Sequence, residues 1–151
     1  MGSGKTTVGR RVAELTGAQF TDLDREIELA QGRSVAEIFA EGGEAHFRSL
    51  ELAAFGAALA EDRVVALGGG APMQTPIWSR VQEEAVSVFL DAPLDVIRER
   101  IGDGAGRPLA AGDLQALLDS RLARYREADH VVAAGGPVEE VAREVAALWS
   151  A

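Results

Sequence analysis

The first seven residues, MGSGKTT, constrain the fold of this chain more than any other segment. Glycines around a Gly-Lys-Thr run let successive backbone N–H groups wrap the phosphates of a nucleotide without side chains in the way. Val8, Val12 and Leu15 then recur at helical spacing up to Gly17, which predicts a helix whose N-terminus favours anions. The candidate phosphate-binding residues are Gly2, Ser3, Gly4, Lys5, Thr6 and Thr7.

Two side chains of this loop have specific expected roles. Lys5 would reach the β- and γ-phosphates, and the hydroxyl of Thr6 would ligate Mg²⁺. The alternative is a flexible, glycine-rich tail, since short matches of this kind also arise by chance. Counted backwards, the first glycine of the full pattern falls two positions before Met1. We therefore expect the N-terminal strand of such a fold, about ten residues with the opening glycine, to be missing from this chain, leaving its sheet neighbours unpaired.

Composition limits the class of protein. The 151 residues, 47% of them hydrophobic, suffice for one core, and no linker-like tract divides them, so we expect a single domain over residues 1–151. The chain has no cysteine and no segment apolar enough for a signal peptide or membrane span. We expect a cytoplasmic protein without a membrane partner. A net charge of −9 argues against nucleic acid as a partner.

Short β-prone runs alternate with helical patterns along the chain. The predicted strands are residues 18–23, 63–67, 86–90 and 130–133, and the predicted helices include 44–59, 91–101 and a last one from Pro137 to Trp149. Ser34-Val35-Ala36-Glu37 has the pattern of a capping box. This alternation predicts an α/β fold with a parallel sheet between two helical layers, in which ligands bind beyond the carboxyl ends of the strands.

Polar residues and glycines gather at those predicted strand ends. Asp22 and Asp24 would project to one side of an extended chain, one toward metal and the other toward substrate, although capping of the next helix is the alternative. The second strand leads into Gly68-Gly69-Gly70, which would let backbone N–H groups approach a ligand. A plain loop is the other interpretation.

Three arginines are candidate contacts to an anionic substrate. Arg48 lies one helical turn from Glu51, and this pair could orient the guanidinium for a carboxylate or could be an ordinary surface ion pair. Arg107 lies in a glycine-rich segment, about 102–113, that we expect to close as a lid over the phosphates, an exposed linker being the alternative. Arg121 is the first of several arginines that cluster at the end of a later predicted helix.

Taken together, these motifs resemble the shikimate kinases in order and spacing over essentially the whole chain. The motifs are GSGKTT, Asp22-x-Asp24, Phe47-Arg48-x-x-Glu51, Gly68-Gly69-Gly70, Arg107-Pro108-Leu109 and Arg121-x-x-x-Tyr125. The resemblance implies a three-layer α/β/α P-loop NTPase fold. It also implies transfer of a phosphoryl group from ATP, with Mg²⁺, to the 3-hydroxyl of shikimate in aromatic amino acid biosynthesis. The family further suggests a monomer.

The resemblance also implies residue roles. Asp24 would bind the ring hydroxyls and accept the reacting proton, while Lys5 and Arg107 stabilise the transferring phosphoryl group. Arg48 and Arg121 would hold the substrate carboxylate. Gly69 and Gly70 would offer backbone donors, and Asp22 would join Thr6 at Mg²⁺ through a water molecule. Two alternatives stay open: a binding module that does not turn over, and a kinase of another small hydroxy acid.

Overall fold

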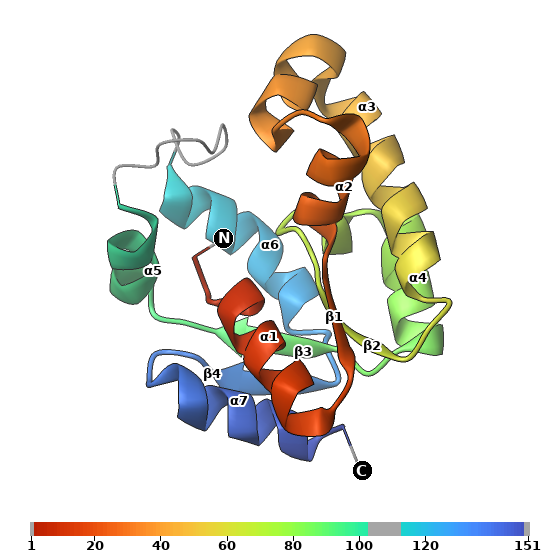
Figure 1. Cartoon of the computed structure of the whole chain (residues 1–151). Helices are drawn as coiled ribbons and strands as arrows, with labels where there is room; N and C mark the ends of the chain where they lie inside the picture. The colour runs from red at the N-terminus through yellow and green to blue at the C-terminus, as the bar shows by residue number, and fades with distance from the viewer. Residues whose placement is uncertain (1, 103–112, 150–151) are drawn as a thin grey trace.

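Helices and short strands alternate along the chain in the computed structural model, which describes residues 2–102 and 113–149 (Figure 1). The elements of the first half are α1 (Lys5–Thr16), β1 (Gln19–Asp22), α2 (Leu23–Gln31), α3 (Val35–Ala58), β2 (Arg63–Ala66) and the 3₁₀ turn η1 (Ala71–Met73). Those of the second half are α4 (Thr75–Glu84), β3 (Val88–Asp91), α5 (Leu94–Ile101), α6 (Leu114–Tyr125), β4 (His130–Ala133) and α7 (Val138–Ala147).

The described strands form two parallel pairs. β1 pairs with β2, with Gln19 opposite Arg63, and β3 pairs with β4, with Val88 opposite His130. Among the described residues, no ladder joins β2 to β3. The predicted parallel pairing is therefore confirmed, and so is the expectation that two strand edges inside the fold are without a partner.

Apolar side chains pack on both faces of these strands, as the predicted three-layer fold requires. On β2, Val64 packs against one cluster and the next residue, Val65, against another. The first cluster joins α1, α5 and α7 to β3 and β4: Val8, Val12, Leu90, Ala92, Ile97, Val132, Ala134, Val141 and Ala142. The second joins the start of α2 with α3, η1 and α4: Leu23, Phe55, Ala58, Ala71, Ile77, Trp78 and Val81.

The predicted helices are present in the structure, but their boundaries are shifted. Ser34 and Glu37 form the predicted capping box, and Gly17 ends α1 in the left-handed conformation. The predicted helix over 44–59 is the second part of α3, because Gly43 interrupts that helix with φ 72° and ψ 179°. Strand β1 is shorter than predicted, since α2 already begins at Leu23.

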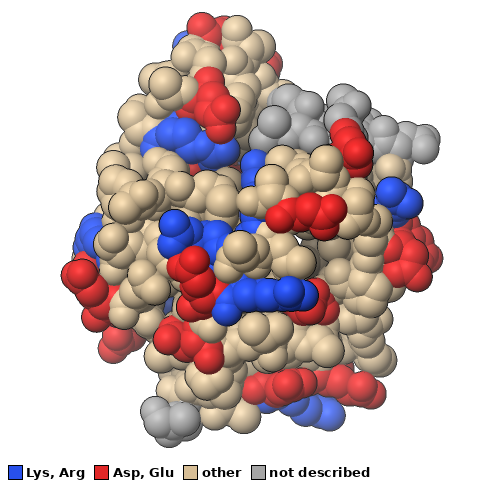
Figure 2. All heavy atoms as spheres, turned by 180° about the vertical axis from the view of Figure 1, so that it is seen from behind, with Lys and Arg blue, Asp and Glu red and all other residues tan. Residues whose placement is uncertain are grey.

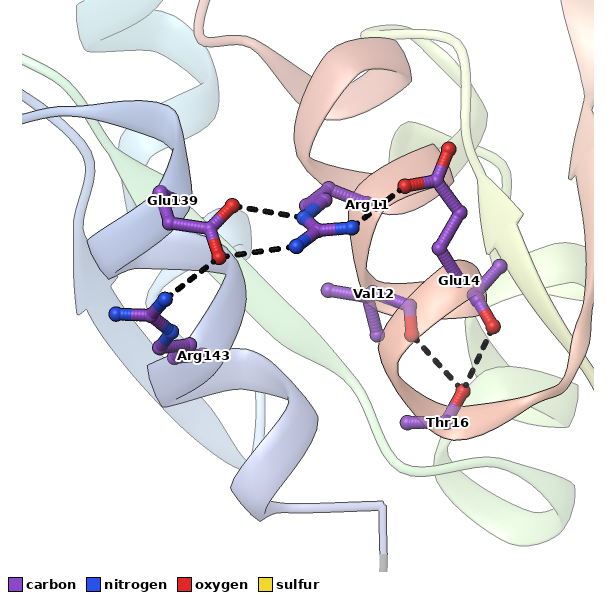
Figure 3. A network of polar contacts seen from close by, with 7 residues as sticks. Arg11, Val12, Glu14, Thr16, Glu139 and Arg143 are labelled. Carbon is purple, nitrogen blue, oxygen red and sulfur yellow. Dashed lines mark hydrogen bonds and ion pairs between the residues drawn. The ribbon is translucent and has the colours of Figure 1, made fainter.

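A charged network fixes α1 against α7 (Figure 3). Arg11 donates two hydrogen bonds to Glu139, from Nε at 2.7 Å and from Nη2 at 3.0 Å. Glu14 and Arg143 extend the network, pairing with Arg11 at 2.8 Å and with Glu139 at 2.9 Å. The hydrogen bonds from Arg11 hold the pKa of Glu139 below its usual value. The helix that follows the phosphate loop is thus tied to the last helix of the chain.

Acidic and basic side chains are interspersed on the face seen from behind in Figure 2. Several form pairs along one helix, such as Arg80 with Glu84 at 2.7 Å on α4. Within the two described ranges, none of the helices combines the length and the apolar character needed to cross a bilayer.

Candidate active site

The N-terminal loop has the backbone shape of an anion-binding turn. Gly2 and Gly4 have φ values of 69° and 92°, a region that residues with a side chain rarely adopt. Helix α1 starts directly afterwards, and Val8 N donates to Gly4 O at 2.8 Å. Lys5 Nζ lies 3.4 Å from Ser3 Oγ, so this ammonium folds back over the loop. The N–H groups of the first turn of α1 have no partner within the helix and are suited to phosphate oxygens.

The two predicted metal ligands lie together. Thr6 Oγ1 donates a hydrogen bond to Asp22 Oδ2 at 2.6 Å, across sixteen positions of sequence. A hydroxyl and a carboxylate in contact are oxygen ligands of the kind that Mg²⁺ prefers, and Mg²⁺ on nucleotide phosphates usually needs only one or two ligands from the protein. These two residues therefore fit the ion, although the described residues contain no group of three acidic or histidine side chains that could hold a metal by itself.

The predicted geometry of the Asp22 and Asp24 pair was wrong in one respect. Only Asp22 lies on the strand, where its side chain accepts a hydrogen bond from Arg25 N at 3.3 Å and caps α2. Asp24 lies in the first turn of α2. The capping alternative thus applies to Asp22, and Asp24 reaches the strand ends from a helix whose N-terminus favours its negative charge.

Asp24 and Glu51 both approach Gly68. A methyl group on Gly68 would place its carbon 2.8 Å from Asp24 Oδ1 and 2.6 Å from Glu51 Oε1. This residue is therefore a glycine because two carboxylates occupy the space of its side chain. Burial raises the pKa of Glu51 and the charge of Asp24 adds to this effect, whereas hydrogen bonds from Arg48 and Gln74 oppose it.

Arg48 is held over Gly70 by two glutamates. Its Nη1 donates to Glu51 Oε2 at 2.6 Å, and its Nε and Nη2 both donate to Glu44 Oε1, at 3.2 and 3.0 Å. A methyl group on Gly70 would lie 2.2 Å from Arg48 Nη2. Burial lowers the pKa of Arg48, but the hydrogen bonds and charges of Glu51 and Glu44 together outweigh burial and raise this pKa above its usual value. Glu51 itself is fully buried and Glu44 is 65% exposed, so the predicted pair is far from an ordinary surface contact.

Arg121 reaches the same loop through a tyrosine. Tyr125 Oη donates to Gly69 O at 2.6 Å, and Arg121 on α6 hydrogen-bonds to Tyr125. Burial raises the pKa of the Tyr125 phenol, while the charges of Arg121 and Arg48 act against this rise. The two predicted carboxylate-binding arginines are thus close enough to act on one phenol.

Two functional contacts were absent from the sequence analysis. Gln74 Nε2 donates to Glu51 Oε2 at 2.7 Å, and Tyr125 holds Gly69. The sequence marked Tyr125 only as part of a motif, and Gln74 had no signal because a lone glutamine after a turn is common. The predicted lid residue Arg107 lies outside the described residues, as does nearly all of the predicted lid.

One cavity borders both the phosphate loop and the glycine loop after β2. Ser3 and Lys5 of the phosphate loop line it, as do Gly68, Gly69 and Tyr125. The phosphate loop and Gly69, one of the residues predicted to bind the substrate, therefore border a shared space.

Comparison with known proteins agrees with this geometry. A family model described as shikimate kinase matches residues 1–149. The chain is 46% identical to a shikimate kinase of Salinispora tropica, over 97% of this chain and 92% of that protein, and 44% identical to one of Salinispora arenicola, over 99% and 93%. The solved structure of shikimate kinase from Acinetobacter baumannii in complex with shikimate superimposes with a TM-score of 0.91 at 32% identity, covering 98% of this chain and 87% of that one. This chain therefore belongs to the shikimate kinase family, with the P-loop kinase fold, ATP and Mg²⁺ that its sequence predicts.

Proposed function

We propose that this chain transfers the γ-phosphoryl group of ATP to the 3-hydroxyl of shikimate. The observation that carries the proposal is the convergence of Asp24 and Arg48 on one glycine loop, Gly68 to Gly70. A carboxylate and a guanidinium that lie against one short loop match a substrate that has both a hydroxyl to be activated and a carboxylate to be bound.

Arg48 and Arg121 are proposed to hold the substrate carboxylate. Arg48 is positioned by buried Glu51, and Arg121 is positioned by Tyr125. Gly69 and Gly70 are proposed to donate backbone N–H groups to the substrate, and the carbonyl of Gly69 is already occupied by Tyr125. Binding at three points fixes the orientation of the ring and thereby selects the hydroxyl that faces Asp24.

Asp24 is proposed to orient the reacting hydroxyl and to accept its proton. Its carboxylate lies beside Gly68, and as the bond to phosphorus forms it can take the proton that the hydroxyl loses. Gly2, Ser3, Gly4 and Thr7 are proposed to hold the phosphates through the backbone, and Lys5 and Arg107 to stabilise their charge. Mg²⁺, when held by Thr6 and Asp22, would neutralise charge on the phosphate oxygens.

The test is an assay of ADP release with shikimate and Mg²⁺ each present or omitted. We expect release only when both are present, and we expect little release with other hydroxy acids such as quinate or gluconate. Release with one of those acids but not with shikimate would favour a kinase of a different substrate. A folded chain that binds ATP and shikimate but releases no ADP would be a binding module, and it would overturn the proposal.

We further propose that the chain acts as a single-domain monomer in the cytoplasm. The two larger apolar clusters both include residues of strand β2, which supports one cooperative unit. Sedimentation velocity over a range of concentrations and a single calorimetric unfolding transition are the expected results. A concentration-dependent dimer or two separated transitions would contradict this assembly.

A further inference from the structure

Gln74 lies at the N-cap position of α4, which short polar side chains usually occupy. Its backbone is fixed on both sides: its N–H donates to Ala71 O at 3.0 Å, and its carbonyl accepts from the N–H groups of Ile77 and Trp78, at 3.1 and 2.9 Å. Among the described residues, no N–H group of α4 donates to the Gln74 side chain. A side chain that sits on a fixed backbone and does not cap its own helix is available for another contact.

The amide of Gln74 reaches Glu51 on α3 instead. Gln74 Nε2 donates to Glu51 Oε2 at 2.7 Å, and the same oxygen accepts from Arg48 Nη1 at 2.6 Å. Glu51 is fully buried, and within the part of the chain that the structure describes its other oxygen, Oε1, has no hydrogen-bond partner. Gln74 therefore contributes one of the two hydrogen bonds that this buried carboxylate accepts from the described side chains.

A second donor fixes the plane of the carboxylate. The terminal torsion of a glutamate side chain is broad, so Arg48 alone would let the carboxylate turn. Asp24 acts from the other side, because Asp24 Oδ1 and Glu51 Oε1 lie 2.8 and 2.6 Å from the same point, the place of a methyl carbon on Gly68. Like charges this close repel, and the repulsion is stronger where water is excluded. Gln74 therefore holds Glu51 toward Arg48 against this repulsion.

We propose that Gln74 is a positioning residue, which orients the Glu51 carboxylate and through it the Arg48 guanidinium that binds the substrate carboxylate. This inference rests on the proposed function and adds a residue to it. Gln74 follows η1, which begins directly after Gly70, and Met73 N of that turn donates to Gly70 O at 3.1 Å. The amide of Gln74 thus joins the glycine loop to α3, the two segments that are proposed to hold the substrate.

The same hydrogen bond favours the ionised form of Glu51. Burial raises the pKa of Glu51, and the charge of Asp24 on α2 raises it further, whereas Arg48 on α3 and the hydrogen bond from Gln74 lower it. A protonated Glu51 has no negative charge with which to hold the guanidinium of Arg48. Loss of the Gln74 amide should therefore let Glu51 take up a proton, and release Arg48, at a higher pH than in the wild-type chain.

Gln74→Leu removes the donor while keeping a side chain of similar size. We expect the Kd of shikimate, measured by calorimetry, to rise about three- to tenfold, because a hydrogen bond to a charged group is lost and part of that loss reaches Arg48. The kcat should change little, since Arg48 is proposed to bind the carboxylate rather than the reacting hydroxyl. Gln82→Leu, at an exposed position on the same helix, is the matched control and should keep the wild-type Kd. An unchanged Kd in the Gln74 variant would overturn the proposal.

Gln74→Ser separates positioning from stability. Serine is a good N-cap residue, so this variant should gain a cap for α4 and keep a Tm close to that of the wild-type chain. Its short side chain does not reach Glu51, so we expect the Kd of shikimate to rise as it does in Gln74→Leu. Recovery of both the Tm and the Kd in the serine variant would show that Gln74 only stabilises the fold, and would contradict the proposed role.

Titration of Glu51 tests the contact without substrate or turnover. Its carboxyl carbon can be assigned in NMR spectra by the loss of its signal in Glu51→Gln. We expect the midpoint of Glu51 to lie at a higher pH in Gln74→Leu than in the wild-type chain, and to be unchanged in Gln82→Leu. A midpoint that stays the same or falls in Gln74→Leu would overturn the proposal.

The outcomes also distinguish this inference from the proposed function. A wild-type chain that binds no shikimate would contradict both. Equal shikimate affinity in the wild-type chain and Gln74→Leu would contradict the role of Gln74 alone.

Discussion

The hydroxyl of Tyr125 donates a hydrogen bond of 2.6 Å to the backbone carbonyl of Gly69, 56 positions earlier in the chain. This contact ties α6 to the glycine loop after β2. Arg121 lies one turn before Tyr125 on the same helix and hydrogen-bonds to it, so a single phenol sets the position of a backbone and of a guanidinium. The Gly69 backbone and the Arg121 guanidinium both belong to the proposed substrate-binding site.

Replacement of Tyr125 by phenylalanine should weaken substrate binding more than it affects turnover. The substitution leaves the carbonyl of Gly69 without its donor and removes the anchor of Arg121, while the ring keeps its packing against Phe89. We expect the shikimate KM to rise about tenfold, with kcat nearly unchanged, and the free energy of unfolding to fall by about 1–3 kcal/mol. Steady-state kinetics and urea unfolding measure these quantities. An unchanged KM would mean that the contact serves stability alone.

The pKa of Tyr125 is open to direct measurement because the chain contains one tyrosine. Burial raises its pKa above the usual 10.0, so absorbance of the phenolate should appear at higher pH in the folded chain than in the urea-unfolded chain. Because the folded pKa is raised, this group's contribution to stability is present below pH 10 and is lost as the pH rises through the folded pKa.

Arg121→Gln provides the control for that titration. Arg121 acts to lower the pKa of Tyr125, so its removal should move the phenolate midpoint of the folded chain still higher. The unfolded chain should titrate as before. A midpoint that moves downward in this variant would show that Arg121 does not act on the phenol.

Gly70→Ala should displace Arg48. The new methyl carbon would lie 2.2 Å from Arg48 Nη2, so the guanidinium must leave its place over the loop. We expect a loss of stability of about 1–3 kcal/mol and a higher shikimate KM. Gly56→Ala in α3 is the matched control, since its methyl group would be 3.4 Å from the end of the flexible Arg80 side chain and the helix gains propensity. Similar KM values in the two variants would contradict the displacement.

Glu44 should compete with the substrate for Arg48. One exposed carboxylate oxygen of Glu44 accepts from both Nε and Nη2 of Arg48, the edge that a substrate carboxylate would occupy. Glu44→Gln should therefore lower the shikimate KM by about two- to fivefold, the range expected of an exposed ion pair. Glu41→Gln, which alters an exposed pair with Arg33, is the control and should leave KM unchanged. A higher KM in the Glu44 variant would show that Glu44 orients Arg48.

Asp24→Asn should reduce kcat by about 10²- to 10⁴-fold, because the amide cannot accept the proton of the reacting hydroxyl. Binding of ATP, followed with a fluorescent nucleotide analogue, should be preserved. Asp95→Asn is the matched control, since Asp95 is exposed on the first turn of α5, away from the glycine loop. Comparable turnover in the Asp24 variant and the wild-type chain would remove Asp24 from the chemistry.

Local patterns in the sequence determined the elements that depend on nearby residues. The run MGSGKTT predicts a turn followed by a helix because glycine permits positive φ and the helix period follows at once. Ser34 with Glu37 and Gly17 likewise mark helix ends through contacts within one turn. The predicted strands also placed Asp22 and Gly68-Gly69-Gly70 at one end of the fold, because residues at the carboxyl ends of parallel strands share an edge.

Tertiary structure alone decided how those residues meet. The sequence could not show that Gly68 and Gly70 leave room for Asp24, Glu51 and Arg48, because the side chains that fill the space come from other elements. The sequence analysis placed Asp24 on an extended chain, whereas Asp22 caps a helix that begins at Leu23 and includes Asp24. The burial of Glu51 and the reach of Tyr125 to Gly69 likewise depend on packing between distant segments. Periodicity reports which face of an element is apolar, but only the assembled fold determines which neighbour covers that face.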